Sequence, residues 1–230
     1  MDVRPILLSF QTAIIAILFT FVLGTGVAYI VFRLKNRKLK ILLNSLFTLP
    51  LVLPPTVFGF FLLTIFGVQQ PVGQFLLDFF AIQVVFSWPA TVIAAVAVSF
   101  PLMYRSALTA FEQMDSELLA VAQTLGFSES RYFRKIALPL SMNGLLAGGV
   151  LAFARGLGEF GATTMLAGNI AGKTRTLPLA IYSAVASGDW RLANQYVVIM
   201  LLLCLIMLLL CLIILFFTEF FSQRAWRRSE

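Results

Sequence analysis

The sequence contains little that could support catalysis or metal binding. It has no histidine, two cysteines and ten acidic residues among 230 residues. The acidic residues are scattered along the chain, so neither a metal site nor a histidine-based catalytic triad can be assembled from them. Cys204 and Cys211 lie seven residues apart in one apolar stretch, which predicts free thiols near one helix face rather than a disulfide.

Charged residues are scarce and apolar residues dominate. Hydrophobic residues make up 60% of the chain and charged residues 12%. A water-soluble fold of this length could not bury so much apolar surface, so the composition indicates an integral membrane protein. The net charge of +7 would suit a nucleic-acid partner, but the positions of the charges instead mark one side of a membrane. We therefore expect the chain to lie in a lipid bilayer and to have no nucleic-acid partner.

Several apolar stretches reach the length of about 20 residues that a helix needs to cross the hydrocarbon core. We predict an all-α membrane protein whose transmembrane domain covers residues 6–218, with about five spans at residues 6–32, 41–68, 88–110, 140–165 and 193–218. The segment 72–86 is also apolar, but Gln74, Asp78 and Gln83 interrupt it. We interpret this segment as a re-entrant or interfacial piece rather than a sixth span.

Lysine and arginine residues concentrate in the short loops on one side of these spans. They lie at residues 33–40, at residues 105–135, which are at the end of the third span or between the third and fourth spans, and after the fifth span. Positive charge marks the cytoplasmic side, so we predict an external N-terminus and a C-terminus that ends in a basic cytoplasmic tail at residues 219–230. The longest loop, residues 111–139 between the third and fourth spans, then lies in the cytoplasm.

Three prolines interrupt the second span. Pro50, Pro54 and Pro55 fall within six residues and are followed by Thr56. Because proline has no amide donor, the backbone must bend or unwind at membrane depth. Irregular backbone persists in a bilayer only where protein buries it or where it lines a wet cavity. The segment is therefore either part of a translocation pathway or a kink that improves packing.

The fourth span combines a face of small residues with two charges. Gly144, Gly148, Ala152 and Gly156 recur every four residues, and this pattern predicts a close helix-packing seam. Arg155 and Glu159 are spaced so that they can pair on the same helix. Ionised side chains inside a span are usually paired or face water. We leave open whether this pair is structural or acts directly in gating or in attracting an anion.

Residues 167–174 nearly match a phosphate-cradling loop, with Ala167 at the position of the first glycine. A working loop of that kind follows a strand, opens a helix and needs an acidic magnesium partner. Here the stretch follows a membrane span on the predicted external side. We therefore expect no nucleotide binding by this chain.

The cytoplasmic loop contains a short amphipathic helix in our interpretation. Asp115 or Ser116 can cap its start, and Gly126 supplies a natural end. Between them the apolar residues recur at helical spacing, at Leu119, Val121, Ala122 and Leu125. The apolar face of such a helix can insert into a groove on a partner protein.

This loop resembles the coupling motif of ABC importer permeases, in which a Glu-Ala-Ala triplet precedes a glycine by four residues and Ile-x-Leu-Pro follows ten residues after that glycine. The positions that match in spacing are Ala122, Gly126, Ile136, Leu138 and Pro139. The family glutamate falls on Ala120, and Glu117, one turn earlier, is its candidate substitute. The resemblance implies that the residues coupling the chain to an ATPase are Glu117, Ala120, Val121, Ala122, Leu125 and Gly126.

Other segments look like the molybdate and tungstate permeases of this family, namely residues 53–56, 158–163, 167–169 and 175–182. Sulfate permeases share much of this pattern, and the length of 230 residues favours molybdate. The resemblance implies the type I ABC importer permease fold in the bacterial cytoplasmic (inner) membrane. It also implies a second copy of the chain, two cytoplasmic ABC ATPase subunits and an external molybdate-binding protein as partners.

The resemblance further implies transport by alternating access, with no catalytic residue and no cofactor in this chain, because the partner ATPase uses ATP and magnesium. Candidate pathway or gate residues are Pro54, Pro55, Thr56, Arg155, Glu159, Thr163 and Thr164. A secondary transporter would instead need carboxylates at mid-membrane, and Glu159 is the only acidic residue within a predicted span. A membrane-embedded enzyme would need clustered nucleophiles and acids, and the sequence shows none.

Overall fold

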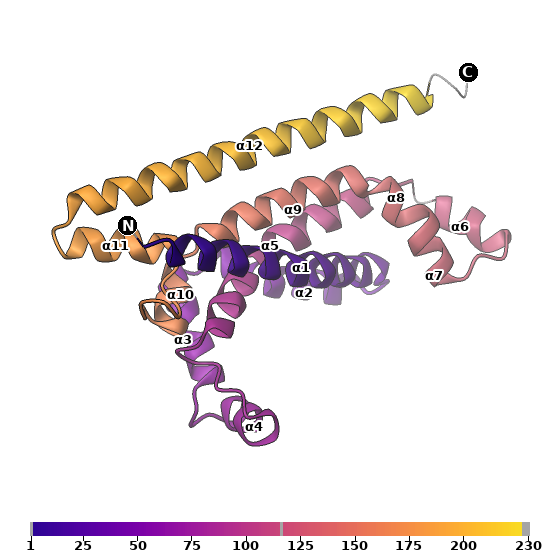
Figure 1. Ribbon diagram of the computed structural model, residues 1–230. Helices are drawn as coiled ribbons and strands as arrows, with labels where there is room; N and C mark the ends of the chain where they lie inside the picture. Colours follow the sequence, from indigo (N-terminus) through magenta and orange to yellow (C-terminus); the bar gives the residue numbers. More distant parts are fainter. Residues whose placement is uncertain (1, 116, 227–230) are drawn as a thin grey trace.

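The computed structural model describes residues 2–115 and 117–226, with the backbone alone at residues 214, 215 and 217–226. Ser116 and the last residues of the predicted tail, 227–230, lie outside this part. The regular elements that it contains are helical (Figure 1). They are α1 (Arg4–Arg33), α2 (Arg37–Val52), α3 (Pro55–Phe66), α4 (Pro71–Phe80), α5 (Trp88–Glu112), α6 (Glu117–Thr124), α7 (Glu129–Tyr132), the π-helix η1 (Phe133–Ala137), α8 (Leu138–Leu140), α9 (Met142–Leu157), α10 (Gly161–Ala167), α11 (Leu177–Ala186) and α12 (Trp190–Trp226).

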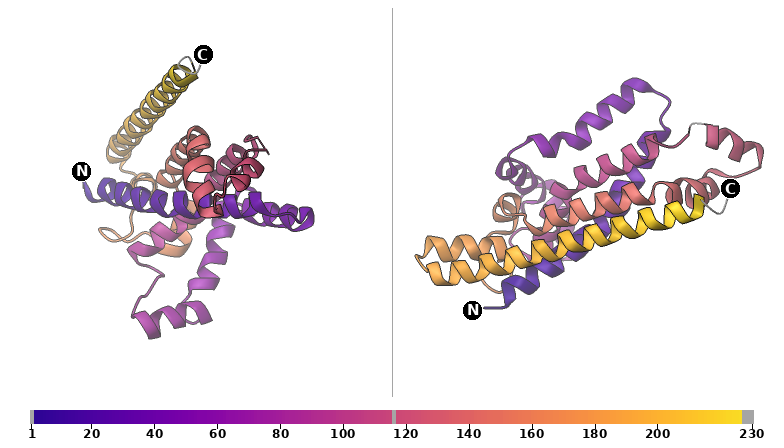
Figure 2. Two further views of the ribbon diagram at one scale, coloured as in Figure 1. Left: turned by 90° about the vertical axis from the view of Figure 1, so that its right-hand side faces the viewer. Right: turned by 90° about the horizontal axis from the view of Figure 1, so that it is seen from above.

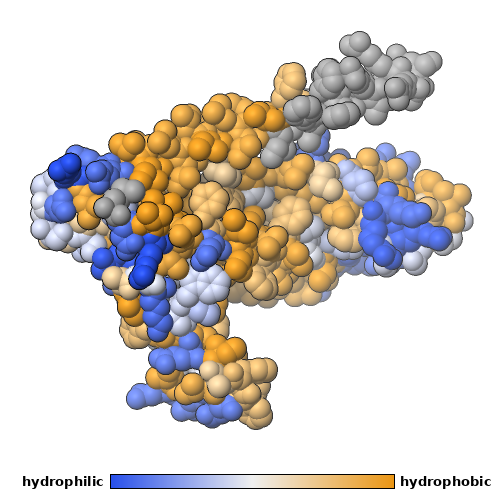
Figure 3. All heavy atoms as spheres, in the orientation of Figure 1, coloured by the Kyte–Doolittle hydropathy of each residue, from blue (hydrophilic) through white to orange (hydrophobic). Residues whose placement is uncertain are grey.

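The lengths of the helices allow between three and five membrane crossings within the described residues. The helices α1, α5 and the first part of α12 are each long and apolar enough to cross a bilayer, and two bent helix pairs raise the number to five if each pair is one span. The apolar surface covers the middle of the bundle, and hydrophilic residues gather at both ends (Figure 3). This distribution is the one expected of a chain that crosses a membrane along the bundle axis.

The second predicted span is sharply bent at its prolines. Helix α2 ends at Val52, α3 begins at Pro55, and the two axes differ by 113°. Pro50 lies inside α2 without ending it. The bend falls at Pro54 and Pro55 because two successive residues there lack the amide donor that would continue the helix. The predicted irregular backbone is confirmed.

The fourth predicted span is not continuous. The helices on either side of Ser141 are bent by 73°, α9 ends at Leu157 and α10 begins at Gly161. The expectation of one helix over residues 140–165 is therefore wrong at residue 141 and at residues 158–160. The backbone at Phe160, with φ −126° and ψ −51°, is not helical. The physical reason is a cap: a carboxylate three residues before Ala162 starts a new helix there, as described below.

The segment at 72–86 does not form a long helix. It contains α4, whose ten residues span about 15 Å, roughly half of the hydrocarbon thickness. Helix α4 lies with α3 on an arm that projects from the bundle (Figures 1 and 2). Its length fits a re-entrant or interfacial piece.

The core of the bundle is formed by α1, α5 and α9, which lie side by side (Figure 2). Helices α1 and α5 run parallel, because the hydroxyls of Thr12 and Thr91 lie 2.9 Å apart and those of Thr20 and Ser99 lie 3.1 Å apart. The small-residue face of α9 packs against α5 and so forms the predicted seam. A Cβ on Gly144 would come within 2.6 Å of Ala110 Cβ.

The seam between α1 and α5 leads to a stability prediction. A Cβ on Gly24 would lie 2.7 Å from Met103 Cγ and 3.3 Å from the Tyr104 backbone nitrogen, whereas a Cβ on Gly26 would meet nothing within 4 Å. We expect Gly24→Val to lower the free energy of unfolding by about 1–3 kcal/mol through overpacking. Gly26→Val, on the same helix, should change it by less than about 0.5 kcal/mol. Thermal unfolding of both purified variants in detergent measures the difference, and equal midpoints would contradict the prediction.

One helix was not predicted from the sequence. Helix α11 lies between the fourth and fifth predicted spans, and its side chains Leu177 and Leu179 are fully buried. It packs against α12, and the Tyr196 hydroxyl of α12 donates to the Asp2 carbonyl at 3.0 Å. These contacts hold the start of α1 and the start of α12 at one end of the molecule, opposite α6 (Figure 1).

Candidate functional site

Helix α6 projects from one end of the bundle, beyond the ends of α5 and α9 (Figure 1). Asp115 Oδ1 accepts the Glu117 amide at 2.9 Å at its start. At its end Gly126 has φ +74°, and the Phe127 amide donates to the Ala122 carbonyl at 2.9 Å. This left-handed glycine closes the helix in a Schellman motif. The predicted end at Gly126 is confirmed. Of the two candidates for the start, Asp115 accepts an amide of α6, and Ser116 lies outside the described residues.

The apolar residues of α6 divide between two faces. Ala122 is 2% exposed and packs in the core cluster that contains Phe111, and Leu118 and Leu119 pack against the same cluster. Val121 and Leu125, one turn apart, are 54% and 70% exposed. The sequence predicted a single apolar face; the structure uses one part of it to hold α6 in place and leaves Val121 and Leu125 as an exposed ridge. Glu117 and Ala120 are exposed beside this ridge.

The loop that carries α6 is joined to the end of α1, and the end of α5 is joined to the start of α2. Arg33 pairs with Glu129, and Lys40 Nζ lies 2.7 Å from Glu112 Oε1. The rings of Tyr29 and Phe133 lie 4.5 Å apart between centroids. A displacement of α6 would therefore move the ends of α1 and α5 together with it.

The buried phenol of Tyr132 belongs to the same attachment. Burial raises the pKa of Tyr132, and the nearby Arg33 lowers it to a smaller extent. The side chain is 3% exposed and lies in the core cluster. Tyr132 is thus an uncharged anchor of the loop at physiological pH.

The two broken spans, which are the second (α2 and α3) and the fourth (α9 and α10), contact each other. A Cβ on Gly161 of α10 would lie 2.8 Å from Pro55 Cβ of α3, and a Cβ on Gly59 of α3 would lie 2.7 Å from Ala162 Cα. Only glycine allows so close an approach of the two backbones. The structure therefore brings the pathway candidates Pro55 and Thr56 against Gly161, two residues before the candidate Thr163.

Arg155 and Glu159 form the expected ion pair, but not within a single helix. Arg155 Nη1 lies 2.7 Å from Glu159 Oε2, and Glu159 stands in the break after α9 rather than inside a span helix. Its other oxygen, Oε1, accepts the Ala162 amide at 2.7 Å and so caps α10. Glu159 is 3% exposed. Because the charge of Arg155 is compensated by Glu159 and the carboxylate also caps α10, this geometry favours the structural role over the attraction of an anion.

The threonines among the pathway candidates differ in accessibility. Thr163 is 2% exposed, and Thr164 Oγ1 donates to the Phe160 carbonyl at 2.6 Å. Thr56 is exposed at the start of α3. Of these three hydroxyls, Thr56 is thus the one at the surface where α3 and α10 meet. The roles of the pathway candidates stay predictions.

The loop at residues 167–174, whose sequence nearly matches a phosphate-binding loop, does not have the structure of one. It follows α10, a helix, and the amides of Lys173, Thr174 and Arg175 donate to the carbonyl of Ile170. A phosphate-cradling loop presents its amides to a ligand, but these amides bond within the turn. The geometry therefore supports no nucleotide site here.

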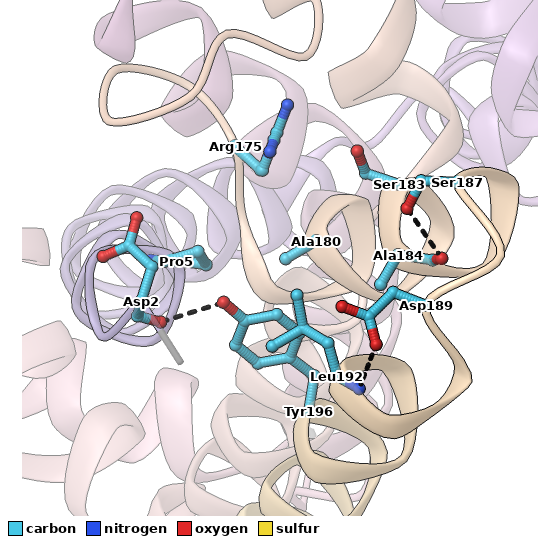
Figure 4. Close-up of a pocket in the computed structure, with 10 residues that line it drawn as sticks. All are labelled: Asp2, Pro5, Arg175, Ala180, Ser183, Ala184, Ser187, Asp189, Leu192 and Tyr196. Carbon is cyan, nitrogen blue, oxygen red and sulfur yellow. Dashed lines mark hydrogen bonds between the residues drawn. The ribbon is translucent and has the colours of Figure 1, made fainter.

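A cleft that the sequence did not indicate lies at the end opposite α6. It has a volume of about 380 Å³, and its lining includes Asp2, Arg175, Asp189 and Tyr196 (Figure 4). Arg175 is held by Asn169, whose Oδ1 accepts its Nε at 2.7 Å. The cleft was missed because α11, which forms one wall, was not predicted as a helix.

Comparisons with known proteins agree with this architecture. The family described as binding-protein-dependent transport system inner membrane component matches residues 20–227. The molybdenum transport system permease protein ModB of Haemophilus influenzae is 44% identical over 185 residues, which cover 80% of either chain.

Two solved structures share the fold. The MetNI methionine ABC transporter aligns with a TM-score of 0.63 at 16% identity, covering 99% of this chain and 95% of that one. A bacterial ABC transporter that imports the acidic polysaccharide alginate aligns with a TM-score of 0.70 at 14% identity, covering 96% and 79%. The chain has the type I ABC importer permease fold. It belongs to the family of binding-protein-dependent transport system inner membrane components.

Proposed function

We propose that this chain is the permease subunit of an ATP-driven importer that carries molybdate into the cell by alternating access. Two copies enclose the pathway, two ATPase subunits bind on the cytoplasmic side, and an external binding protein delivers the anion. ATP and magnesium are used by the ATPase, and this chain binds no cofactor. The proposal of molybdate rests on the relative from H. influenzae and on the sequence resemblance.

The observation that carries the proposal is the exposed ridge of α6. Val121 and Leu125 lie at one end of the molecule on a short helix that is anchored to the bundle through Ala122. An exposed apolar pair at i and i+4 is suited to insertion into a groove of a partner. Since α6 is tied to α1 and α5, a partner that moves it transmits force to the spans.

The residues of the broken spans support ATP-driven transport rather than ion-coupled transport. The carboxylate of Glu159 is occupied by Arg155 and the Ala162 amide, so it is not available to couple a cation. The contact between α3 and α10 is close and rests on glycines, as expected of a gate that opens when helices separate. Weak contacts along such a path let the anion leave as well as enter.

The test is uptake by proteoliposomes that contain the permease and its ATPase, with the binding protein outside and ATP inside. We expect molybdate uptake that requires ATP and the ATPase subunit. Competition by tungstate and by sulfate then ranks the oxyanions, and sulfate uptake without molybdate uptake would reassign the substrate within the family. Molybdate uptake by the permease without the ATPase would contradict the proposal.

A further inference from the structure

A polar groove runs along the half of α5 nearest α6. It has a volume of about 330 Å³ and lies between α5 and α9, where Gly144 and Ala147 leave room. Its polar lining consists of Arg105, Ser106, Thr109 and Gln113. A second cavity of about 440 Å³ shares Ala110, Gln113 and Gly144 with it and is also lined by Asp115 and by Leu118 of α6. The groove therefore leads toward the end of the molecule that carries the coupling helix.

Arg105 is an uncompensated charge inside a predicted span. It lies seven residues before the end of α5, about 10 Å along the helix axis, and its side chain is exposed. Among the side chains that the structure describes, the ion pairs are Arg33–Glu129, Lys40–Glu112 and Arg155–Glu159, so Arg105 has no carboxylate partner there. An exposed guanidinium without a carboxylate partner is free to meet water or an anion.

The groove lies on the same face of α5 as the junction of the broken spans. Val98, seven residues or two turns before Arg105, packs with Ala162 and Leu166 of α10 and Leu62 of α3. Beyond this contact α3 and α10 no longer cover α5, and the face becomes polar with Arg105 and Thr109 exposed. One continuous face of α5 thus connects the junction of α3 and α10 with the polar groove.

We propose that Arg105, with the hydroxyls of Ser106 and Thr109 and the amide of Gln113, is an inner station for a tetrahedral oxyanion on the translocation pathway. The guanidinium supplies charge and a planar set of donors suited to such an anion, and the hydroxyls and amide supply further donors. The inference rests on the proposed function, in which the anion is molybdate. A lipid phosphate has the same chemistry and is the other source of an oxyanion at this depth.

Uptake of molybdate by the complete importer tests this station. Arg105→Gln should reduce ATP-dependent uptake about tenfold, and Arg105→Lys should retain a larger share because it keeps the charge. Arg37→Gln, an equal change of charge at an exposed residue outside the groove, should behave as wild type. If the wild-type importer takes up no molybdate, the proposed function fails. If it does and Arg105→Gln matches Arg37→Gln, only the inner station is overturned.

A thiol probe keeps the inference testable if Arg105→Gln does not assemble. Thr109→Cys is placed in an importer that also carries Cys204→Ala and Cys211→Ala, and modification of residue 109 is followed by peptide mass spectrometry. In a maltoside detergent free of phospholipid, an anionic methanethiosulfonate should react about tenfold faster than a cationic one, and molybdate should slow it. Equal reaction rates of the two reagents would show that there is no anion site. A reaction that is slowed in phospholipid vesicles but not by molybdate would show that the site holds a lipid phosphate. Either result would overturn the proposal.

Discussion

Replacing Leu125 by glutamate is expected to abolish ATP-driven molybdate uptake while leaving the permease folded. The side chain is 70% exposed, so the bundle does not depend on it. If it inserts into a groove of the ATPase, its burial contributes about 1.5–3 kcal/mol to binding, and an unpaired carboxylate there adds a desolvation penalty. At about 1.4 kcal/mol per factor of ten, the Kd of the ATPase for the permease should rise about 100-fold or more. Titration of the ATPase onto purified permease measures this change, and uptake by proteoliposomes measures its consequence.

Ala120→Glu is the matched control for this variant. It adds the same charge to the same exposed helix, and the family motif carries a glutamate at that position. We expect it to bind the ATPase and to transport as wild type does. Wild-type affinity of the Leu125→Glu variant would remove α6 as the docking element. An equal loss in both variants would show that the helix responds to added negative charge rather than to the loss of its apolar ridge.

The long apolar helices could be located from the sequence because nothing in them competes with helix formation. Helix α1 covers the predicted 6–32, and α5 covers the predicted 88–110, since uninterrupted apolar runs of this length have one stable form in a bilayer. Helix α11 escaped prediction because its ten residues are too short to be recognised as a span. Its place depends on packing against α12 and α1, which no local pattern reveals.

The candidate sites were predictable where a local rule applies and not where tertiary contacts decide. Gly126 marks the end of α6 because a left-handed residue is needed there. The division of α6 into an anchoring face around Ala122 and an exposed ridge depends on the neighbouring helices. Helical periodicity places apolar residues on both faces and does not tell which of them is buried. Likewise, two proline or glycine breaks far apart in sequence gave no sign that Pro55 and Gly161 would touch.

Removing the buried carboxylate at position 159 is expected to be the most destabilising single change in the spans. Glu159→Ala takes the partner from Arg155 and the cap from the Ala162 amide at once. Loss of one member of a buried pair costs about 3–5 kcal/mol, and we expect the lower end because the Arg155 side chain is 31% exposed. Glu159→Gln keeps an oxygen for the amide and should lose less. Thermal unfolding of the purified permease in detergent gives the order of the two variants.

Asp189→Ala separates this effect from the loss of an ordinary cap. Asp189 Oδ1 accepts the Leu192 amide at 3.0 Å at an exposed helix start, so its removal should cost about 1 kcal/mol.

A structural pair and a gating pair differ in one further measurement, which is uptake per folded importer. For a structural role, the Glu159→Gln importer should transport at the wild-type rate once its smaller folded fraction is taken into account. A Glu159→Gln importer that is as stable as wild type but transports tenfold more slowly would instead assign Glu159 to the gate. The close contact of α3 and α10 around Gly161 would then be the moving part that the carboxylate controls.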